Sequence, residues 1–353
     1  MARLEDVDKN FKVETSIEKE GLKFYDALSA PFEIYGVYME DGKFRRLPEA
    51  VAEKVSKGVL HLHANCAGGR IRFRTDSPYV AISTEYGEIG DMAHFPLTGS
   101  AGFDIYINDG EGEKYLQTFV PPRATVNMGK MEAVRDIPNP KMYDITINMP
   151  LYSEVKKVYI GLHADAKVEK PTPYSNEKPI VYYGSSITQG GCASRPGNCY
   201  QAYISRRFNC DYINLGFSGN AKAEDAIIEY IKNLPMSVFV YDYDHNAPTV
   251  EHLRNTHEKM FKAIRKAQPD IPVIIMSRPK YSLIDVEKER RTIIETTYNN
   301  AVSAGDKNVC FIDGKTLMAL CEENGTVDNC HPTDLGFFSM AKAVGDVMER
   351  ILK

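Results

Sequence analysis

The chain has 353 residues, of which 43% are hydrophobic and 26% are charged. This composition is ordinary for globular proteins and excludes a fibrous or wholly disordered chain, and the length predicts about two domains. Forty-three basic residues against forty-eight acidic ones give a net charge of -5. We therefore expect neither nucleic acid nor membrane as a partner. The chain has no basic excess to neutralise phosphates, and no apolar run approaches the ~20 residues that span a bilayer.

The amino terminus carries acidic residues where a secretory signal needs an apolar stretch. Seven cysteines are an odd number without a C-x-x-C pair, which is a poor framework for disulfides or structural zinc. These features predict a cytoplasmic protein, although a leader cleaved from a longer precursor would leave the same sequence. The oligomeric state stays open, with a homo-oligomer among the alternatives.

The first half of the chain alternates apolar and polar residues with period two. Ile71 and Phe73 share one face of a short segment whose other face carries arginines, and residues 103–107, 144–148 and 155–162 repeat this pattern. Glycine, proline and aspartate turns separate these segments. The pattern predicts a β-sandwich or jelly roll over residues 1–169, with residues 1–30 as a terminal arm.

The second half has a different periodicity. Residues 170–179 hold three prolines without periodicity and are interpreted as a linker. Strands are expected at 180–183, 212–214, 237–241, 272–276 and 309–312, and helices at 198–207, 223–232, 248–268 and 334–352. This alternation predicts an α/β domain over residues 180–353, with a parallel sheet covered by helices on both faces. Ligands of such sheets bind at the carboxyl ends of the strands.

The segments after the first two strands carry candidate catalytic groups. Ser186 follows strand one in the run Gly-Ser-Ser-Ile-Thr-Gln-Gly-Gly, and a serine on a glycine-flanked strand-to-helix turn can present its Oγ above the sheet. A plain turn is the alternative. Gly219 follows strand two, where a residue without Cβ lets a backbone N–H approach a substrate, and a glycine at a helix start is the alternative.

The segment after the third strand has three interpretations. Asn246 offers an amide donor to an oxyanion, or instead caps the helix expected from Pro248. Asp242, Asp244 and His245 would bind a metal only if all three turned to one side, so we expect no metal there.

A histidine and an aspartate precede the last helix. Asp328 and His331 are three residues apart in an irregular segment, where the carboxylate can fix the imidazole tautomer. Taken together, serine, glycine, asparagine and the Asp/His pair follow successive strands of one sheet, and they fill every role of an acyl-transfer site.

These blocks resemble those of the SGNH (GDSL-type) hydrolases over residues 178–353. The run Gly-Phe-Asp-Ile-Tyr at 102–106 is similar to the GxDLY amino-terminal domain of one bacterial branch of these enzymes, which includes carbohydrate acetyl esterases. Two positions depart from the family pattern. Ser185 replaces the usual Asp before the nucleophile, and Asn246 is followed by Ala where many members have Asp. The resemblance implies a flavodoxin-like, three-layer α/β/α catalytic domain.

The resemblance also implies a role for each residue. Ser186 would be the nucleophile, His331 the general base and acid, and Asp328 the group that orients His331. The oxyanion hole would comprise the N–H groups of Ser186 and Gly219 and the amide of Asn246. No metal or organic cofactor is implied.

Other residues near these blocks invite further hypotheses. Arg278, just past strand four, and Asp244 are candidate substrate-binding residues, although an ordinary surface arginine is as good an interpretation. A Cys–His nucleophile would use one of the cysteines that flank the blocks, Cys192, Cys199 and Cys330. Glycan binding by the first half would need exposed aromatic side chains, for which the candidates are Tyr79, Tyr86, Tyr106 and Tyr115.

We therefore expect a serine ester hydrolase that removes short acyl groups, above all O-acetyl groups, from a small-molecule or oligosaccharide ester. A lysophospholipase or thioesterase is the alternative, and a catalytically inactive glycan-binding protein is a third. A pocket-wall or dimer-contact role for the first half is favoured over independent glycan binding.

Overall fold

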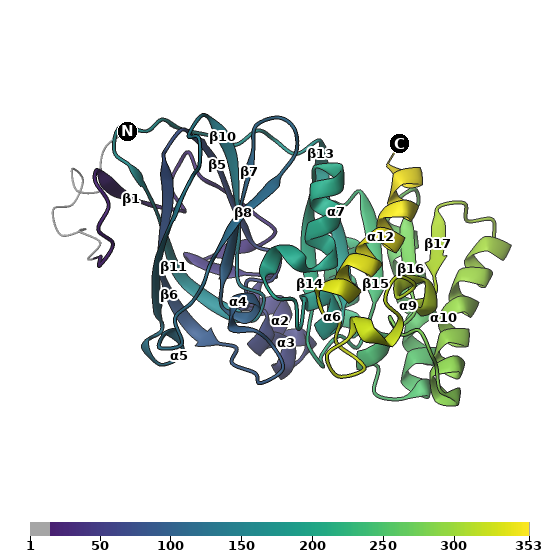
Figure 1. The fold of residues 1–353 in the computed structure, drawn as a ribbon. Coiled ribbons are helices and arrows are strands. Elements are labelled where there is room, and N and C mark those ends of the chain that lie inside the picture. The colour runs from purple at the N-terminus through teal and green to yellow at the C-terminus, as the bar shows by residue number, and fades with distance from the viewer. Residues whose placement is uncertain (1–14, 353) are drawn as a thin grey trace.

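Two antiparallel sheets face each other across the first half of the chain in the computed structural model, which describes residues 15–352 (Figure 1). The four-stranded sheet has the order β1 (Leu22–Asp26), β11 (Ser153–His163), β6 (Tyr79–Ile89), β9 (Lys130–Asp136). The second sheet has the order β12 (Val168–Glu169), β5 (Arg70–Thr75), β10 (Tyr143–Asn148), β7 (Phe103–Asn108), β8 (Lys114–Phe119), and β2 (Glu33–Tyr35) also pairs with β5. A separate hairpin joins β3 (Tyr38–Glu40) and β4 (Lys43–Arg45).

One apolar core lies between the two sheets. Ile71 and Phe73 of one sheet and Ile82 and Ile160 of the other are fully buried in the same cluster. The predicted sandwich is thereby confirmed. The arm expected over residues 1–30 is wrong for its last part, because Leu22–Asp26 pair with β11 along their whole length. Residues 1–14 lie outside the described residues.

Short helices interrupt the first half, and the period-two pattern did not predict them. They are α2 (Glu49–Val55), α3 (Lys57–Leu62), α4 (Leu97–Ser100) and α5 (Thr125–Met128). At four to seven residues each is too short to show a 3.6-residue period. Ala52 of α2 and Val59 of α3 are buried in the same cluster as Leu215 and Ile228 of the second half. The two halves therefore share a core.

The second half contains a five-stranded parallel sheet. Its order is β14 (Cys210–Gly216), β13 (Asn176–Gly184), β15 (Val238–Asp242), β16 (Val273–Met276), β17 (Val309–Ile312). Neighbouring residues of β13 enter different cores, Tyr182 on one face and Val181 and Tyr183 on the other. The first strand begins at Asn176, inside the segment predicted as a linker, because Asn176 already pairs with Cys210.

Helices cover both faces of this sheet (Figure 1). One face carries α7 (Tyr200–Phe208), α11 (Gly314–Leu317) and α12 (Asp334–Ile351), and the other carries α8 (Asp225–Lys232), α9 (Val250–Ala267) and α10 (Asp285–Ser303). The predicted three-layer arrangement is confirmed. The sequence analysis missed α10, because its buried positions include the polar Glu287, Arg290 and Thr297 and so break the apolar period.

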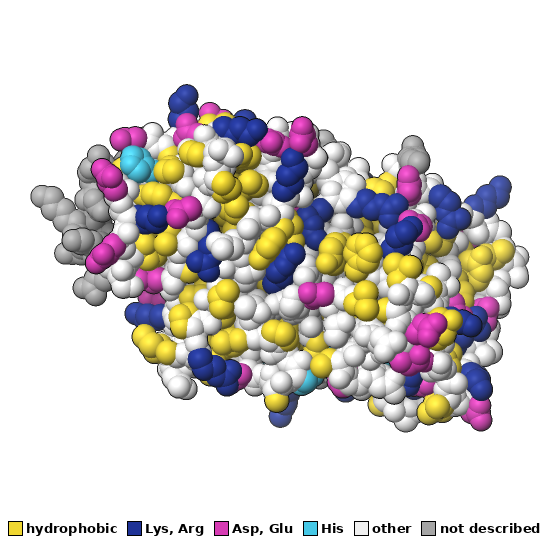
Figure 2. Space-filling view, in the orientation of Figure 1, with side chains coloured by type: hydrophobic (Ala, Val, Ile, Leu, Met, Phe, Trp, Pro, Cys, Tyr) yellow, Lys and Arg dark blue, Asp and Glu magenta, His cyan; other side chains and the backbone are white. Residues whose placement is uncertain are grey.

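Among residues 15–352, no helix combines the length and apolar character that crossing a bilayer requires. On the face seen in Figure 2, basic and acidic side chains are interspersed over both halves.

Candidate active site

The carboxyl ends of three adjacent strands bring the predicted groups together. Gly184, the last residue of β13, is level with Gly216 of β14 and Asp242 of β15. Ser186, the first residue of α6 (Ser186–Gln189), comes two residues later, while Gly219 and Asn246 follow the other two strands. The nucleophile candidate and both oxyanion candidates therefore leave the sheet at the same edge.

Ser186, His331 and Asp328 form a continuous chain of hydrogen bonds. The Oγ atom of Ser186 lies 2.9 Å from Nε2 of His331, and Nδ1 of His331 lies 2.7 Å from Oδ2 of Asp328. With its Nδ1–H donated to the carboxylate, the imidazole presents an unprotonated Nε2 to the hydroxyl. This arrangement can remove the proton of Ser186 as its oxygen attacks a carbonyl carbon.

Asp328 also organises its own turn. Its Oδ1 atom accepts the backbone N–H groups of His331 at 2.7 Å and of Cys330 at 3.1 Å. Burial acts to raise the pKa of this carboxyl, but the hydrogen bonds from His331 and Cys330 outweigh it and hold the pKa below its usual value. Asp328 therefore stays ionised near neutral pH and can stabilise a protonated His331.

Gly219 and Asn246 have the properties expected of oxyanion donors. Gly219 has a φ of +70°, is exposed, and has no atom within 4 Å of the position a Cβ would take. Asn246 lies in the 3-10 turn η2 (Asp244–Asn246) and donates one amide hydrogen to the carbonyl of Phe217 at 2.9 Å. The second amide hydrogen remains for a ligand.

The alternative roles of these two residues are wrong. The helix after Asn246 is capped by Thr249, whose hydroxyl accepts the N–H of His252 at 3.0 Å. The helix after Gly219 starts only at Asp225, so Gly219 is not at a helix start.

Comparison with family models identifies both halves of the chain. Residues 177–352 match the model of the GDSL-like lipase/acylhydrolase family, and residues 22–168 match the model of the GxDLY domain, the N-terminus of SGNH hydrolase-type esterases. The chain is an esterase of the GDSL (SGNH) family. No match was found among curated proteins.

Solved structures with the same two-part architecture include three informative neighbours. A Bacteroides ovatus protein described as a GDSL-like lipase is 26% identical, with a TM-score of 0.83 over 94% of this chain and 98% of that one. A salicylyl-acyltransferase from a tetracycline biosynthetic pathway is 19% identical, with a TM-score of 0.74 over 95% and 98% of the two chains. An acetyl xylan esterase from the rumen bacterium Butyrivibrio proteoclasticus is 13% identical, with a TM-score of 0.58 over 94% and 98%. The last two likenesses show a shared fold.

In this esterase, side chains of the sandwich half hold the turns of the catalytic half. The hydroxyl of Tyr152 donates to the backbone carbonyl of Ser186 at 3.1 Å. The guanidinium of the fully buried Arg46 donates to the carbonyl of Gly216 and packs 4.5 Å from the ring of Phe217, just before the Gly219 turn. Burial lowers the pKa of Arg46 to about 9, so it is still charged at neutral pH.

Gln189 links the Ser186 turn to the Gly219 turn. Its amide N–H group donates to Asn65 Oδ1 at 3.0 Å and to the Leu151 carbonyl at 3.2 Å, and its Oε1 accepts the N–H of Ser218 at 3.0 Å. One buried side chain therefore fixes the helix that begins at Ser186, the segment before Gly219 and the sandwich half relative to each other.

The aspartate of the GxDLY motif joins the sandwich half to the catalytic half through buried hydrogen bonds. Asp104 is fully buried and accepts hydrogen bonds from Arg195 at 2.7 Å, the N–H of Gly197 at 2.8 Å and the amide of Asn148 at 2.8 Å. The motif tyrosine, Tyr106, accepts a further hydrogen bond from Arg195. The motif therefore clamps the segment that follows the Ser186 turn.

The clamped segment in turn holds the start of α12. The backbone N–H of Ser194 donates to Asp334 Oδ1 at 2.8 Å, and the amide of Asn198 donates to Asp334 Oδ2 at 2.7 Å. Asp334 lies three residues after His331. The GxDLY motif is thus connected to the segment that carries His331 through residues 195–198 and Asp334.

Arg278 and Asp244, the candidate substrate-binding residues, belong to an internal ion network. The Asp244 side chain is completely buried and contacts Arg278 Nε at 3.0 Å and Arg290 Nε at 2.7 Å, while Arg278 also contacts Glu287 at 2.9 Å. Arg290 additionally donates to the carbonyls of Asp244 and Ala247, on either side of Asn246. These contacts make the network an anchor for the Asn246 loop. Sequence reasoning missed Arg290 and Glu287 because it missed α10.

Within the Asp242, Asp244 and His245 segment, the Asp244 carboxylate is already paired with Arg278 and Arg290. Asp242 is buried, and neither of its carboxylate oxygens has a hydrogen-bond partner among the described residues. Burial, reinforced by the charge of Asp244, raises the pKa of Asp242 to about 8. Burial lowers the pKa of His245 to about 4.

The geometry also disfavours a cysteine nucleophile. The sulfur of Cys330 lies 3.6 Å from His245 Nδ1, whereas His331 contacts Ser186 and Asp328. Burial raises the pKa of Cys192 to about 12, so its thiol is not ionised near neutral pH. Cys199 is fully buried and donates to the carbonyl of Pro196.

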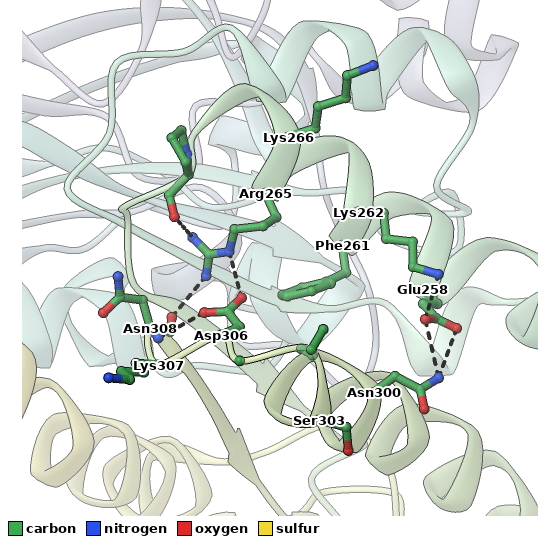
Figure 3. A pocket seen from close by; sticks show the side chains of 14 residues that line it. Glu258, Phe261, Lys262, Arg265, Lys266, Asn300, Ser303, Asp306, Lys307 and Asn308 are labelled. Carbon is green, nitrogen blue, oxygen red and sulfur yellow. Dashed lines mark hydrogen bonds and ion pairs between the residues drawn. The ribbon is translucent and has the colours of Figure 1, made fainter.

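A surface hollow of about 930 Å³ lies away from these groups, between the C-terminal ends of α9 and α10 and the segment before β17 (Figure 3). Two ion pairs lie among its lining side chains, Arg265 with Asp306 at 2.7 Å and Lys262 with Glu258 at 2.8 Å. It is at the amino ends of the strands, the edge opposite the triad, and contains none of the catalytic candidates.

Proposed function

We propose that this esterase is a serine hydrolase that removes short acyl groups, above all O-acetyl groups, from carbohydrates. The observation that carries the serine mechanism is the chain of two hydrogen bonds, 2.9 and 2.7 Å long, that joins Ser186, His331 and Asp328. The carbohydrate substrate is supported by two structural neighbours, a family two carbohydrate esterase from Cellvibrio japonicus and the acetyl xylan esterase, each of which aligns over 94% of this chain and 98% of its own.

The reaction follows from the positions of these groups. Ser186 Oγ attacks the ester carbonyl carbon while its proton passes to His331 Nε2, and the oxygen that becomes negative faces the N–H groups of Ser186 and Gly219 and the amide of Asn246. His331 then donates that proton to the sugar oxygen as its bond to the carbonyl carbon breaks, which releases the sugar hydroxyl and leaves an acyl-serine. Water, deprotonated by His331, releases the acid in the same way. Each oxyanion donor is expected to contribute ~3 kcal/mol, or roughly a hundredfold in rate.

Space is limited at Gly191, which follows the Ser186 helix. A Cβ on Gly191 would lie 2.9 Å from the hydroxyl of Tyr152 and 3.5 Å from Cδ2 of His331. The glycan-binding alternative has less support, because Tyr79, Tyr86 and Tyr106 are buried and the exposed Tyr115 stacks 3.9 Å from the guanidinium of Arg195. All seven cysteines are free, in keeping with our proposal of a cytoplasmic location.

The test is hydrolysis of p-nitrophenyl acetate, butyrate and octanoate by the wild type and by Ser186→Ala. We expect rates that fall with acyl length and a loss of at least a thousandfold in the variant, followed by acetate release from acetylated oligosaccharides. A preference for octanoate would favour the lysophospholipase or thioesterase alternative. Equal, background-level rates for both proteins would contradict the proposal and favour an inactive glycan-binding protein.

A further inference from the structure

Three metal-ligating side chains from separate segments meet beside the triad. His94 lies between β6 and α4 of the sandwich half, Cys192 follows the Ser186 helix, and His331 precedes α12. One ligand atom of each lies within 4.8 Å of the others, and the rings of His94 and His331 are 5.6 Å apart. Within residues 15–352, the imidazole of His94 and the thiol of Cys192 have no hydrogen-bond partner, so both have ligand atoms available for an ion.

The distances are suitable for a tetrahedral ion after a small adjustment. Ligands at 2.0–2.3 Å from zinc stand about 3.5 Å from each other, so the three atoms must approach by roughly 1 Å. His94 is exposed and can make that movement by a side-chain rotation. Cys192 is buried and His331 is held by Asp328, so they provide the fixed part of the site.

The donor set selects the kind of ion. Two imidazoles and a thiolate, formed when the bound ion displaces the proton of Cys192, favour Zn²⁺ and similar borderline or soft ions over Mg²⁺ or Ca²⁺, which prefer oxygen ligands. We propose that His94, Cys192 and His331 form a binding site for Zn²⁺ whose occupancy inhibits the esterase. Nδ1 of His331 is engaged by Asp328, so the ion binds Nε2, the nitrogen that faces Ser186. An occupied Nε2 cannot take the proton of the serine.

Two readouts test the site. The inhibition readout rests on the proposed function, whereas binding does not. Binding is followed by calorimetry with Zn²⁺ and by the thiolate-to-cobalt charge-transfer absorption on titration with Co²⁺. We expect one ion per chain, loss of ester hydrolysis in step with occupancy, and recovery on adding a chelator. Zinc binding without any ester hydrolysis would uphold the site and refute the proposed function, so the two failures are distinguishable.

Single substitutions test whether zinc inhibits the enzyme at this site or at another thiol or histidine. His94→Asn and Cys192→Ser should keep the activity measured without metal and weaken zinc inhibition at least tenfold to a hundredfold, since even residues that only support ligands have effects of that size. Cys330→Ser, which removes a neighbouring thiol outside the trio, is the matched control and should leave inhibition unchanged. His94→Asn alters an exposed side chain and so keeps the test decisive if Cys192→Ser fails to fold. Equal inhibition of wild type and His94→Asn, or the absence of the cobalt band in the wild type, would overturn the proposal.

Discussion

Replacement of Asp104 by Asn should destabilise the protein far more than loss of an ordinary ion pair. Asp104 is completely buried and accepts hydrogen bonds from Asn148, Arg195 and Gly197. An asparagine keeps the shape but has one acceptor atom where the carboxylate has two. In either orientation its NH2 group therefore points at a hydrogen-bond donor. That donor is the amide of Asn148 in one orientation, and Arg195 with the N–H of Gly197 in the other.

The expected loss in the free energy of unfolding follows from the buried groups that the substitution leaves without a partner. Removing one member of a buried ion pair costs about 3–5 kcal/mol, and an unsatisfied buried N–H such as that of Gly197 costs about 1–3 kcal/mol. Arg195 retains its contacts with Tyr106 and Tyr115 and is 18% exposed, which reduces the penalty. We therefore expect a loss of about 3–5 kcal/mol in the free energy of unfolding.

The chain offers a matched control in Asp91→Asn. Asp91 forms a two-bond pair with Arg123, both at 2.8 Å, but the side chains are 34% and 73% exposed. Such exposed pairs contribute less than about 1 kcal/mol. Urea unfolding is followed by far-ultraviolet circular dichroism, because the chain has no tryptophan. A difference of less than about 1 kcal/mol between the two variants would refute the assignment of Asp104 as an interdomain clamp.

Three further predictions concern pH, space and positioning. Asp242 has a folded pKa of about 8 against a usual 3.8, so the native state binds the extra proton. Stability should fall by up to about 1.4 kcal/mol per pH unit from about pH 4 to about pH 8, and urea melts should show this slope flattened in Asp242→Asn. Gly191→Ala places a Cβ 2.9 Å from the Tyr152 hydroxyl and should lower kcat for p-nitrophenyl acetate, while Gly110→Ala, in the turn between β7 and β8 at a φ of +104° with open space around it, should not. Arg290→Lys loses contacts on both sides of Asn246 and should lower kcat roughly tenfold to a hundredfold with little change in KM, measured by steady-state kinetics.

Much of the fold could be predicted because buried apolar side chains recur in the sequence with the period of the strand or helix that carries them. The alternation at Ile71 and Phe73 reflects one face in the apolar core, although Arg70 and Arg72 on the other face are also buried. The apolar run of Val273–Met276 reflects two buried apolar faces. The predictions failed where the buried side chains are polar or where a helix is only four to seven residues long. Helix α10 buries Glu287 and Arg290 in an ion network, which no hydrophobic period records.

The sequence predicts which side chains make up the candidate site, but not the contacts that hold those side chains in place. Ser186, Gly219, Asn246 and His331 follow strand ends, and parallel strands end at one edge, so their proximity follows from the topology. Contacts such as Arg46 with the Gly216 carbonyl span 170 residues of sequence. No local pattern in the chain records contacts of this kind.

These long-range contacts account for the association of a sandwich with the catalytic half. Tyr152 binds the carbonyl of Ser186, and Arg46 binds that of Gly216, so two sandwich side chains reach the backbone of two catalytic turns. If either contact were absent, the freed buried carbonyl would lose one hydrogen bond, at a cost of about 1–3 kcal/mol in stability. The cost in rate would be larger, because transfer through the 2.9 Å contact between Ser186 and His331 is sensitive to shifts of about 1 Å. A sandwich that contributes through positioning needs no glycan-binding surface of its own, which is why buried tyrosines in its sheets are compatible with the carbohydrate substrate proposed above.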